Sequence, residues 1–120
     1  MRHLTEQQAV AALRRRVPIE QMLSKNLEAG SFSWLEAQPC EAGFVLRLHH
    51  TVDAGSDNYV DVYGFGSVDE DDDIGMGELI ATCPDEASLL EAAVEVGAQA
   101  GRWVTAGVIQ DEYRDLRQGP

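Results

Sequence analysis

The sequence has no lysine or arginine between Arg47 and Arg102, although the chain carries nine such residues in 120. Aspartate and glutamate are frequent in the same interval, and the net charge of the chain is −12. A negative field of this kind repels nucleic acid and anionic membranes and attracts a cationic partner. We therefore expect no nucleic-acid and no membrane partner but a basic protein partner. The alternative is that the acidity serves only solubility.

Cysteines and long apolar runs are also scarce. Two cysteines, Cys40 and Cys83, are too few for a disulfide framework and are typical of a reduced cytoplasmic protein. No apolar run reaches the roughly 18 residues of a membrane span. The N-terminal segment 1–16 has no uninterrupted apolar stretch and no export cleavage site, so we expect no signal peptide. These absences predict a cytoplasmic location.

Catalytic signatures are missing as well. The chain contains no GxSxG, HExxH or CxxC motif and no P-loop, so we expect a protein that is not an enzyme and holds no cofactor or metal. One alternative is a small enzyme in which Cys83, at a helix start, has a lowered thiol pKa and acts as a nucleophile. Another uses a histidine, but His49 and His50 are adjacent on a predicted strand and point to opposite faces.

The composition, 44% apolar and 25% charged, is that of one globular domain over residues 1–120. Thr5 and Gln8 have the spacing of a capping box, which predicts a helix to about Arg16. Pro18 suits the first turn of a second helix, and Gly30 is placed to end it. The apolar residues of this second segment fall at helical spacing: Ile19, Met22, Leu23 and Leu27.

After Gly30 the apolar period changes to two residues, which is typical of strands. The pattern predicts four strands, at 32–34, 44–52, 59–65 and 76–82, with turns at 38–43 and 53–58. Short connections between successive strands favour an antiparallel meander.

A third helix should begin near Pro84, with Thr82 or Cys83 as its cap. It carries one apolar row and a second row beside it, and Gly97 and Gly101 weaken its end. The rows are Ala87, Leu90, Val94 and Ala98, and Leu89, Ala93 and Val96. A last helix is predicted at 110–117. The fold class is therefore α+β: N-terminal helices, a four-stranded antiparallel meander sheet, and C-terminal helices packed on one face of the sheet.

The stretch SVDEDDDIG, residues 67–75, places five carboxylates side by side in the predicted loop before the fourth strand. An EF-hand counted from Asp69 would have Ile74 at position six and Ile80 at position twelve, where glycine and glutamate are needed, so calcium is not favoured. Because the carboxylates repel one another, a basic partner would relieve the repulsion and associate quickly. We expect the partner-binding residues to be Asp57, Tyr59, Asp61, Tyr63, Phe65, Asp69, Glu70, Asp71, Asp72, Asp73 and Glu78.

A small, cysteine-poor α+β chain with a concentrated acidic segment, DVYGFGSVDEDDDIGMGELIATCPDEASLLEAAVE, resembles the immunity proteins that bacteria use against polymorphic or contact-dependent toxins. The resemblance covers size, charge and layout. It implies a non-enzymatic inhibitor that binds a basic toxin, for example a nuclease, and occludes its active site. The alternatives are the small enzyme described above and a structural or assembly subunit.

Overall fold

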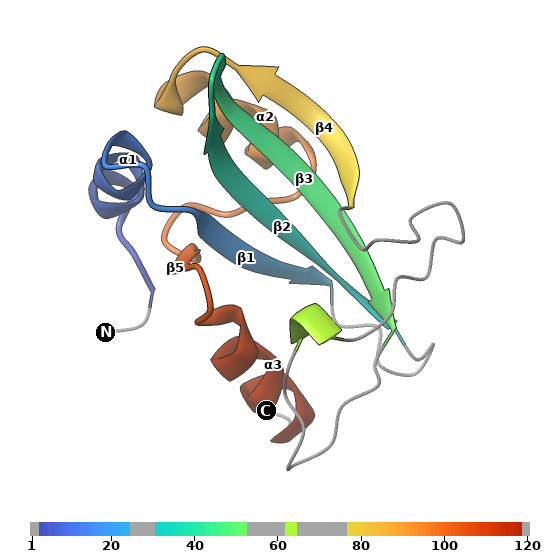
Figure 1. Ribbon diagram of the computed structural model, residues 1–120. Helices are drawn as coiled ribbons and strands as arrows, with labels where there is room; N and C mark the ends of the chain where they lie inside the picture. Colours follow the sequence, from blue (N-terminus) through green and yellow to red (C-terminus); the bar gives the residue numbers. More distant parts are fainter. Residues whose placement is uncertain (1–2, 25–30, 53–61, 65–76, 119–120) are drawn as a thin grey trace.

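The computed structural model describes residues 3–24, 31–52, 62–64 and 77–118, which form an α+β fold around a five-stranded antiparallel sheet (Figure 1). The helical elements are α1 (Glu6–Arg14), the 3-10 turn η2 (Val62–Gly64), α2 (Glu86–Glu95) and α3 (Ile109–Gln118). The strands are β1 (Ile19–Ser24), β2 (Ser31–Cys40), β3 (Gly43–Val52), β4 (Glu78–Cys83) and β5 (Val104–Thr105).

The predicted capping box of the first helix is confirmed. The Thr5 hydroxyl accepts from the Gln8 amide at 3.1 Å, and the Gln8 side chain accepts from the Thr5 amide at 2.9 Å. Two of the otherwise unpaired amides of the first turn are thereby satisfied. The helix ends at Arg14 rather than Arg16, because Arg16 has turned into the left-handed region with a φ of 68°.

The predicted second helix is wrong, because residues 19–24 form strand β1. This strand lies between β2 and β5, with Ile19 opposite Ala37 of β2 and Thr105 of β5. The short segment fits both periods, since Ile19 and Leu23 also share one face of a strand. Backbone pairing on two sides outweighs a helical pattern of this length.

The sheet order is β4-β3-β2-β1-β5, and every neighbouring pair is antiparallel (Figure 1). The meander is therefore present from β1 to β4, but the predicted count of four strands is wrong because β1 and β5 were not expected. Strand β2 runs on through Pro39 to Cys40, where a turn was predicted. Pro39 is accommodated because it lies beyond Ala37, where the pairing of β2 with β1 stops.

The prediction of a strand at 59–65 is wrong for 62–64, which form η2, and the rest of that range lies outside the described residues. The predicted strands at 44–52 and 76–82 correspond to β3 and, over the described residues, to β4. Along β3 the inward-facing apolar residues alternate, whereas β4 has three consecutive apolar residues, Leu79 to Ala81.

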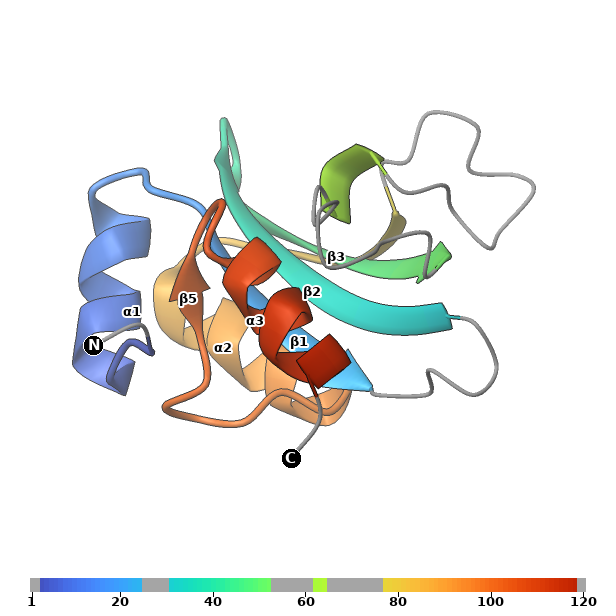
Figure 2. The same cartoon turned by 90° about the horizontal axis from the view of Figure 1, so that it is seen from below.

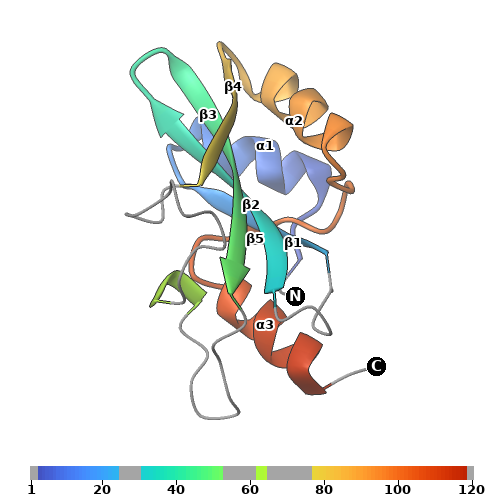
Figure 3. The same cartoon turned by 90° about the vertical axis from the view of Figure 1, so that its right-hand side faces the viewer.

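The helices do not all cover one face of the sheet, which corrects the predicted arrangement. Helices α1 and α2 pack on the face that bears Leu35 and Leu46 and form the main core with it (Figures 2 and 3). Phe32 and Trp34 alternate with Leu35 along β2 and face the other way. They belong to a second core, which also contains Val62 of η2 and two residues of α3, Ile109 and Tyr113.

Helix α2 begins two residues later than predicted, at Glu86 instead of Pro84. Asp85 is its cap, and the Asp85 carboxylate accepts from the Ser88 amide at 2.8 Å. Cys83 instead ends β4, and neither Thr82 nor Cys83 caps the helix. Of the row Leu89, Ala93 and Val96, the first two are completely buried and Val96 is partly buried. The last helix, α3, is within about one residue of its predicted bounds.

Candidate functional site

Most of the predicted partner-binding residues lie outside the described residues, and Tyr63 and Glu78 are the two that the structure describes. Glu78 is exposed at the start of β4. Tyr63 lies in η2, next to the second face of the sheet. The remaining predicted residues, for which the structure makes no statement, are Asp57, Tyr59, Asp61, Phe65, Asp69, Glu70, Asp71, Asp72 and Asp73.

Tyr63 is engaged by the protein's own sheet. Its hydroxyl donates to the carboxylate of Glu20 in β1, with oxygen–oxygen distances of 2.6 and 2.7 Å, and accepts from the Gly107 amide at 2.8 Å. Its ring meets Trp34 edge-on, with centroids 5.7 Å apart. Burial, followed by donation to Glu20, raises the pKa of Tyr63, so the phenol remains a donor at neutral pH. Tyr63 therefore holds η2 against the sheet.

Glu20 is the buried end of this contact, with 1% of its surface exposed. Its carboxylate also accepts from the Gly107 amide at 3.0 Å. Burial raises the pKa of Glu20, while the hydrogen bonds from Tyr63 and Gly107 oppose this shift. The sequence does not single out Glu20, because in the predicted helix over this segment Glu20 would be an ordinary exposed polar residue.

A second buried polar group lies next to Glu20 on the same face. His49 of β3 pairs with Glu36 of β2, at 3.2 Å between Nε2 and Oε1, and its ring stacks on Trp34 with centroids 4.0 Å apart. The indole N–H of Trp34 donates to the Thr51 hydroxyl at 2.9 Å. Glu36 is directly opposite Glu20 in the register of β1 and β2.

These groups form one network that joins the sheet to η2. Among the described residues, every buried side-chain nitrogen and oxygen has a hydrogen-bond partner. No group of three or more His, Cys, Asp or Glu side chains in the described ranges could hold a metal ion. A fully satisfied network of this kind fixes the position of the element that it contacts. We interpret it as the support of η2.

The surroundings of Cys83 disfavour the thiolate that the nucleophile alternative requires. Burial raises the pKa of the Cys83 thiol, and the negative charge of Asp85 adds to the shift. A catalytic thiol needs the opposite change, towards the thiolate. His50, on the other face of β3 from His49, is exposed and hydrogen-bonds the Ser33 hydroxyl at 3.0 Å.

Exposed carboxylates gather along α2, which carries no lysine or arginine. Glu86 pairs with Arg14 of α1 at 3.4 Å. Glu91 and Glu95, one helical turn apart, are both exposed, and within the part of the chain that the structure describes neither has an ion-pair partner. We call the surface formed by Glu91, Glu95 and the neighbouring Glu6 of α1 the α2 acidic surface.

None of the described helices is long and apolar enough to cross a membrane. Comparison with protein-family models, curated proteins and solved structures finds no match to this chain.

Proposed function

We propose that this chain is a non-enzymatic binding protein that neutralises a basic protein partner, and that it acts as an immunity protein by occluding the active site of a toxin such as a nuclease. The acidic field of the sequence and the resemblance described above lead to this proposal. The observation that supports it in the fold is the α2 acidic surface.

Glu91 and Glu95 are like charges at i and i+4, an arrangement that destabilises a helix by about 0.2–0.5 kcal/mol. Alanine or glutamine at either position would form the helix without this repulsion. A lysine or arginine brought by a partner turns the repulsion into attraction. Exposed charges of this kind accelerate association more than they increase final affinity.

The acidic stretch at 69–73 remains a predicted part of the same interface. Glu78, the described carboxylate nearest to it in sequence, is exposed and available to a partner. Tyr63 also remains a predicted part of this interface, since 48% of its surface is exposed although its hydroxyl binds Glu20.

The test begins by capturing the partner on the immobilised protein and identifying it by mass spectrometry. Association with the purified partner is then measured by surface plasmon resonance over a range of salt concentrations. We expect the association rate to fall as salt rises, because exposed charges more than a Debye length apart, about 8 Å at physiological salt, are screened. If the partner is a toxin, the protein should also abolish its activity at equimolar concentration.

Charge-reversal variants locate the interface. One variant carries Glu95→Lys, and a second carries Asp71→Lys, Asp72→Lys and Asp73→Lys together. Each should slow association with the partner. Glu41→Lys is the matched control for Glu95→Lys, since it makes the same substitution at an exposed position in the turn between β2 and β3. Equal association rates for the wild type and both reversals would mean that the acidity serves only solubility.

A further inference from the structure

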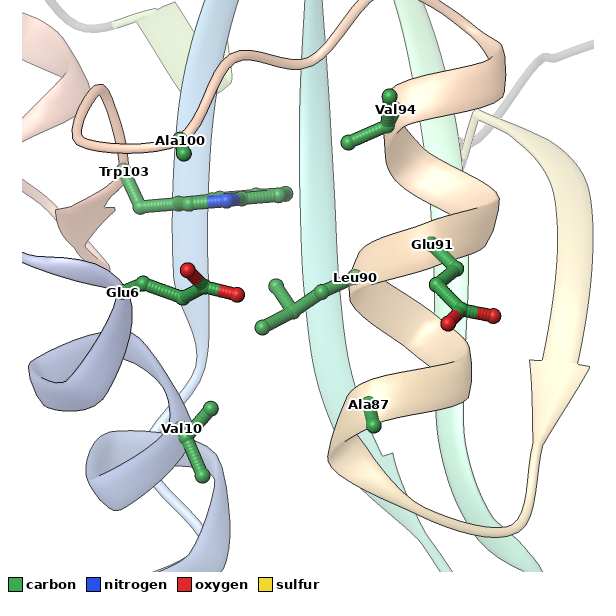
Figure 4. A pocket seen from close by; sticks show the side chains of 8 residues that line it. All are labelled: Glu6, Val10, Ala87, Leu90, Glu91, Val94, Ala100 and Trp103. Carbon is green, nitrogen blue, oxygen red and sulfur yellow. The ribbon is translucent and has the colours of Figure 1, made fainter.

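An apolar groove runs between α1 and α2 on the outer side of the main core. Figure 4 shows Leu90 projecting from α2 towards α1, and the indole ring of Trp103 crossing the space between the helices. The groove encloses about 210 Å³. Its apolar lining consists of Val10, Ala87, Leu90, Val94, Ala100 and Trp103.

The groove uses an apolar row of α2 that the sheet does not bury. Leu89 and Ala93 are completely buried in the main core, whereas Val94 leaves 60% of its surface exposed. Ala87, Leu90 and Val94 are spaced three and four residues apart, so they share one stripe of the helix. Val10 of α1 faces the same space. Helix α2 therefore presents a second apolar stripe that the described chain covers only in part, since Leu90 packs against the main core while Val94 is largely exposed.

Two carboxylates belong to the lining as well. Glu6 reaches from α1 into the space below the Trp103 ring, and Glu91 lies on α2 with its carboxylate on the side away from α1 (Figure 4); no lysine or arginine lines the groove. Arg14 lies beyond it, near the C-terminal end of α1, and is paired with Glu86. An occupant with an apolar stripe and positive charges beside it would match both the apolar lining and these two carboxylates.

The size of the groove distinguishes between two kinds of occupant. Pockets for drug-sized ligands usually measure about 300–1,000 Å³ and enclose most of the ligand. This groove is smaller and only partly enclosed, which suits one or two anchoring side chains of a helix. Helices that bind in grooves insert apolar side chains at i and at i+3 or i+4.

We propose that the groove between α1 and α2 binds the apolar face of a cationic amphipathic helix of a partner protein. This inference rests on the proposed function, since it names the part of the basic partner that the α2 acidic surface receives. Trp103 and Leu90 form the floor for the anchoring side chains, and Glu6 and Glu91 receive the lysines or arginines beside them.

The test uses three synthetic peptides of about five helical turns, or ~18 residues. The first has leucines at i, i+3, i+4 and i+7 and lysines on the opposite face. The second has the same composition in scrambled order. The third keeps the leucine pattern but has glutamate for each lysine. Calorimetry gives the affinities. In a nitrogen–proton NMR spectrum, the indole signal of Trp103 reports on the groove, and that of Trp34, on the other face of the sheet, serves as an internal control.

We expect the first peptide to bind at least tenfold more tightly than the other two and to shift the Trp103 signal but not the Trp34 signal. Val94→Gln should weaken its binding about fivefold, because a valine covered by the peptide would be lost. Leu79→Gln is the matched control: Leu79 is also an exposed aliphatic residue, at 54%, but lies on β4 outside the groove. Circular dichroism checks that both variants fold.

Four results would overturn the inference. Equal binding of the ordered and scrambled lysine peptides would still agree with a basic partner but would show that the groove does not recognise the apolar face of a helix. Equal binding of the lysine and glutamate peptides would show that the groove does not require a cationic helix, and binding of none would show that it does not bind an amphipathic helix at all. The association kinetics with the captured partner test the proposed function separately. A dimer in sedimentation that Val94→Gln dissociates and Leu79→Gln does not would assign the groove to a second copy of this chain.

Discussion

Replacing Tyr63 with phenylalanine tests the network that joins η2 to the sheet. The substitution removes the hydroxyl that donates to the Glu20 carboxylate and leaves the ring that meets Trp34 edge-on. A hydrogen bond to a charged group contributes about 1.5–3 kcal/mol to the free energy of unfolding. Because 48% of the Tyr63 surface is exposed, water can partly replace the hydroxyl. We therefore expect a loss of about 1.5 kcal/mol at neutral pH, the lower end of that range.

The loss should depend on pH with a defined sign. Burial raises the pKa of Glu20 above its ordinary value of 4.5, so the folded state binds this proton more tightly than the unfolded chain. The contribution of Glu20 to stability therefore falls as the pH rises through the folded pKa. Removing the Tyr63 hydroxyl raises that pKa further. The destabilisation by Tyr63→Phe should accordingly be largest at about pH 8 and shrink towards about pH 5.

Urea denaturation followed by tryptophan fluorescence measures these free energies, and Glu20→Gln provides the matched background. Without the charge, the same Tyr63→Phe change should cost only about 0.5 kcal/mol, because the remaining hydrogen bond is between neutral groups. The coupling in the double-mutant cycle should then be about 1 kcal/mol. A cost that is the same at both pH values and unchanged in the Glu20→Gln background would refute the argument that the hydroxyl acts through the Glu20 carboxylate.

Three further predictions concern a glycine, a helix cap and the thiols. Gly43→Ala should destabilise the protein by more than about 3 kcal/mol in urea denaturation, since a β-carbon there would lie 2.3 Å from the Cys83 carbonyl oxygen at a φ of 130°. Gly97→Ala, with a φ of 110° and open space around it, should cost only about 1–2 kcal/mol, and equal costs would argue against the close contact. Thr5→Ala should lower the free energy of unfolding by about 1 kcal/mol, measured in the same way, through loss of the capping box. An alkylating reagent followed by mass spectrometry should label Cys40 before Cys83, because burial raises the pKa of the Cys83 thiol; faster labelling of Cys83 would instead favour the nucleophile alternative.

Part of the fold could be read from local patterns. The capping box at Thr5, the alternation along β3 and the final helix each depend on residues that are close in sequence, so the structure confirms them. The segment 19–24 shows the limit of such patterns. Six residues are too few to distinguish a helical from a strand period, and long-range pairing decided between them.

The candidate site, too, was only partly predictable from the sequence. The acidic field was visible in the sequence because charge can be counted without knowing the fold. The groove was not, because the sequence shows two apolar rows on 86–95 but not which row the sheet would bury. The Glu20–Tyr63 contact joins residues 43 positions apart and could not be inferred from either segment alone.

The sequence by itself determined the sign of the charge on this protein, the class of its fold and several of its elements, because these follow from composition and from contacts within a few residues. Only the tertiary structure decided that residues 19–24 pair on both sides, that the helices divide between two faces, and that α1 and α2 leave an apolar groove between carboxylates. These outcomes depend on which distant segments compete for the same buried surface, and backbone pairing and side-chain packing resolve that competition only when the whole chain is folded.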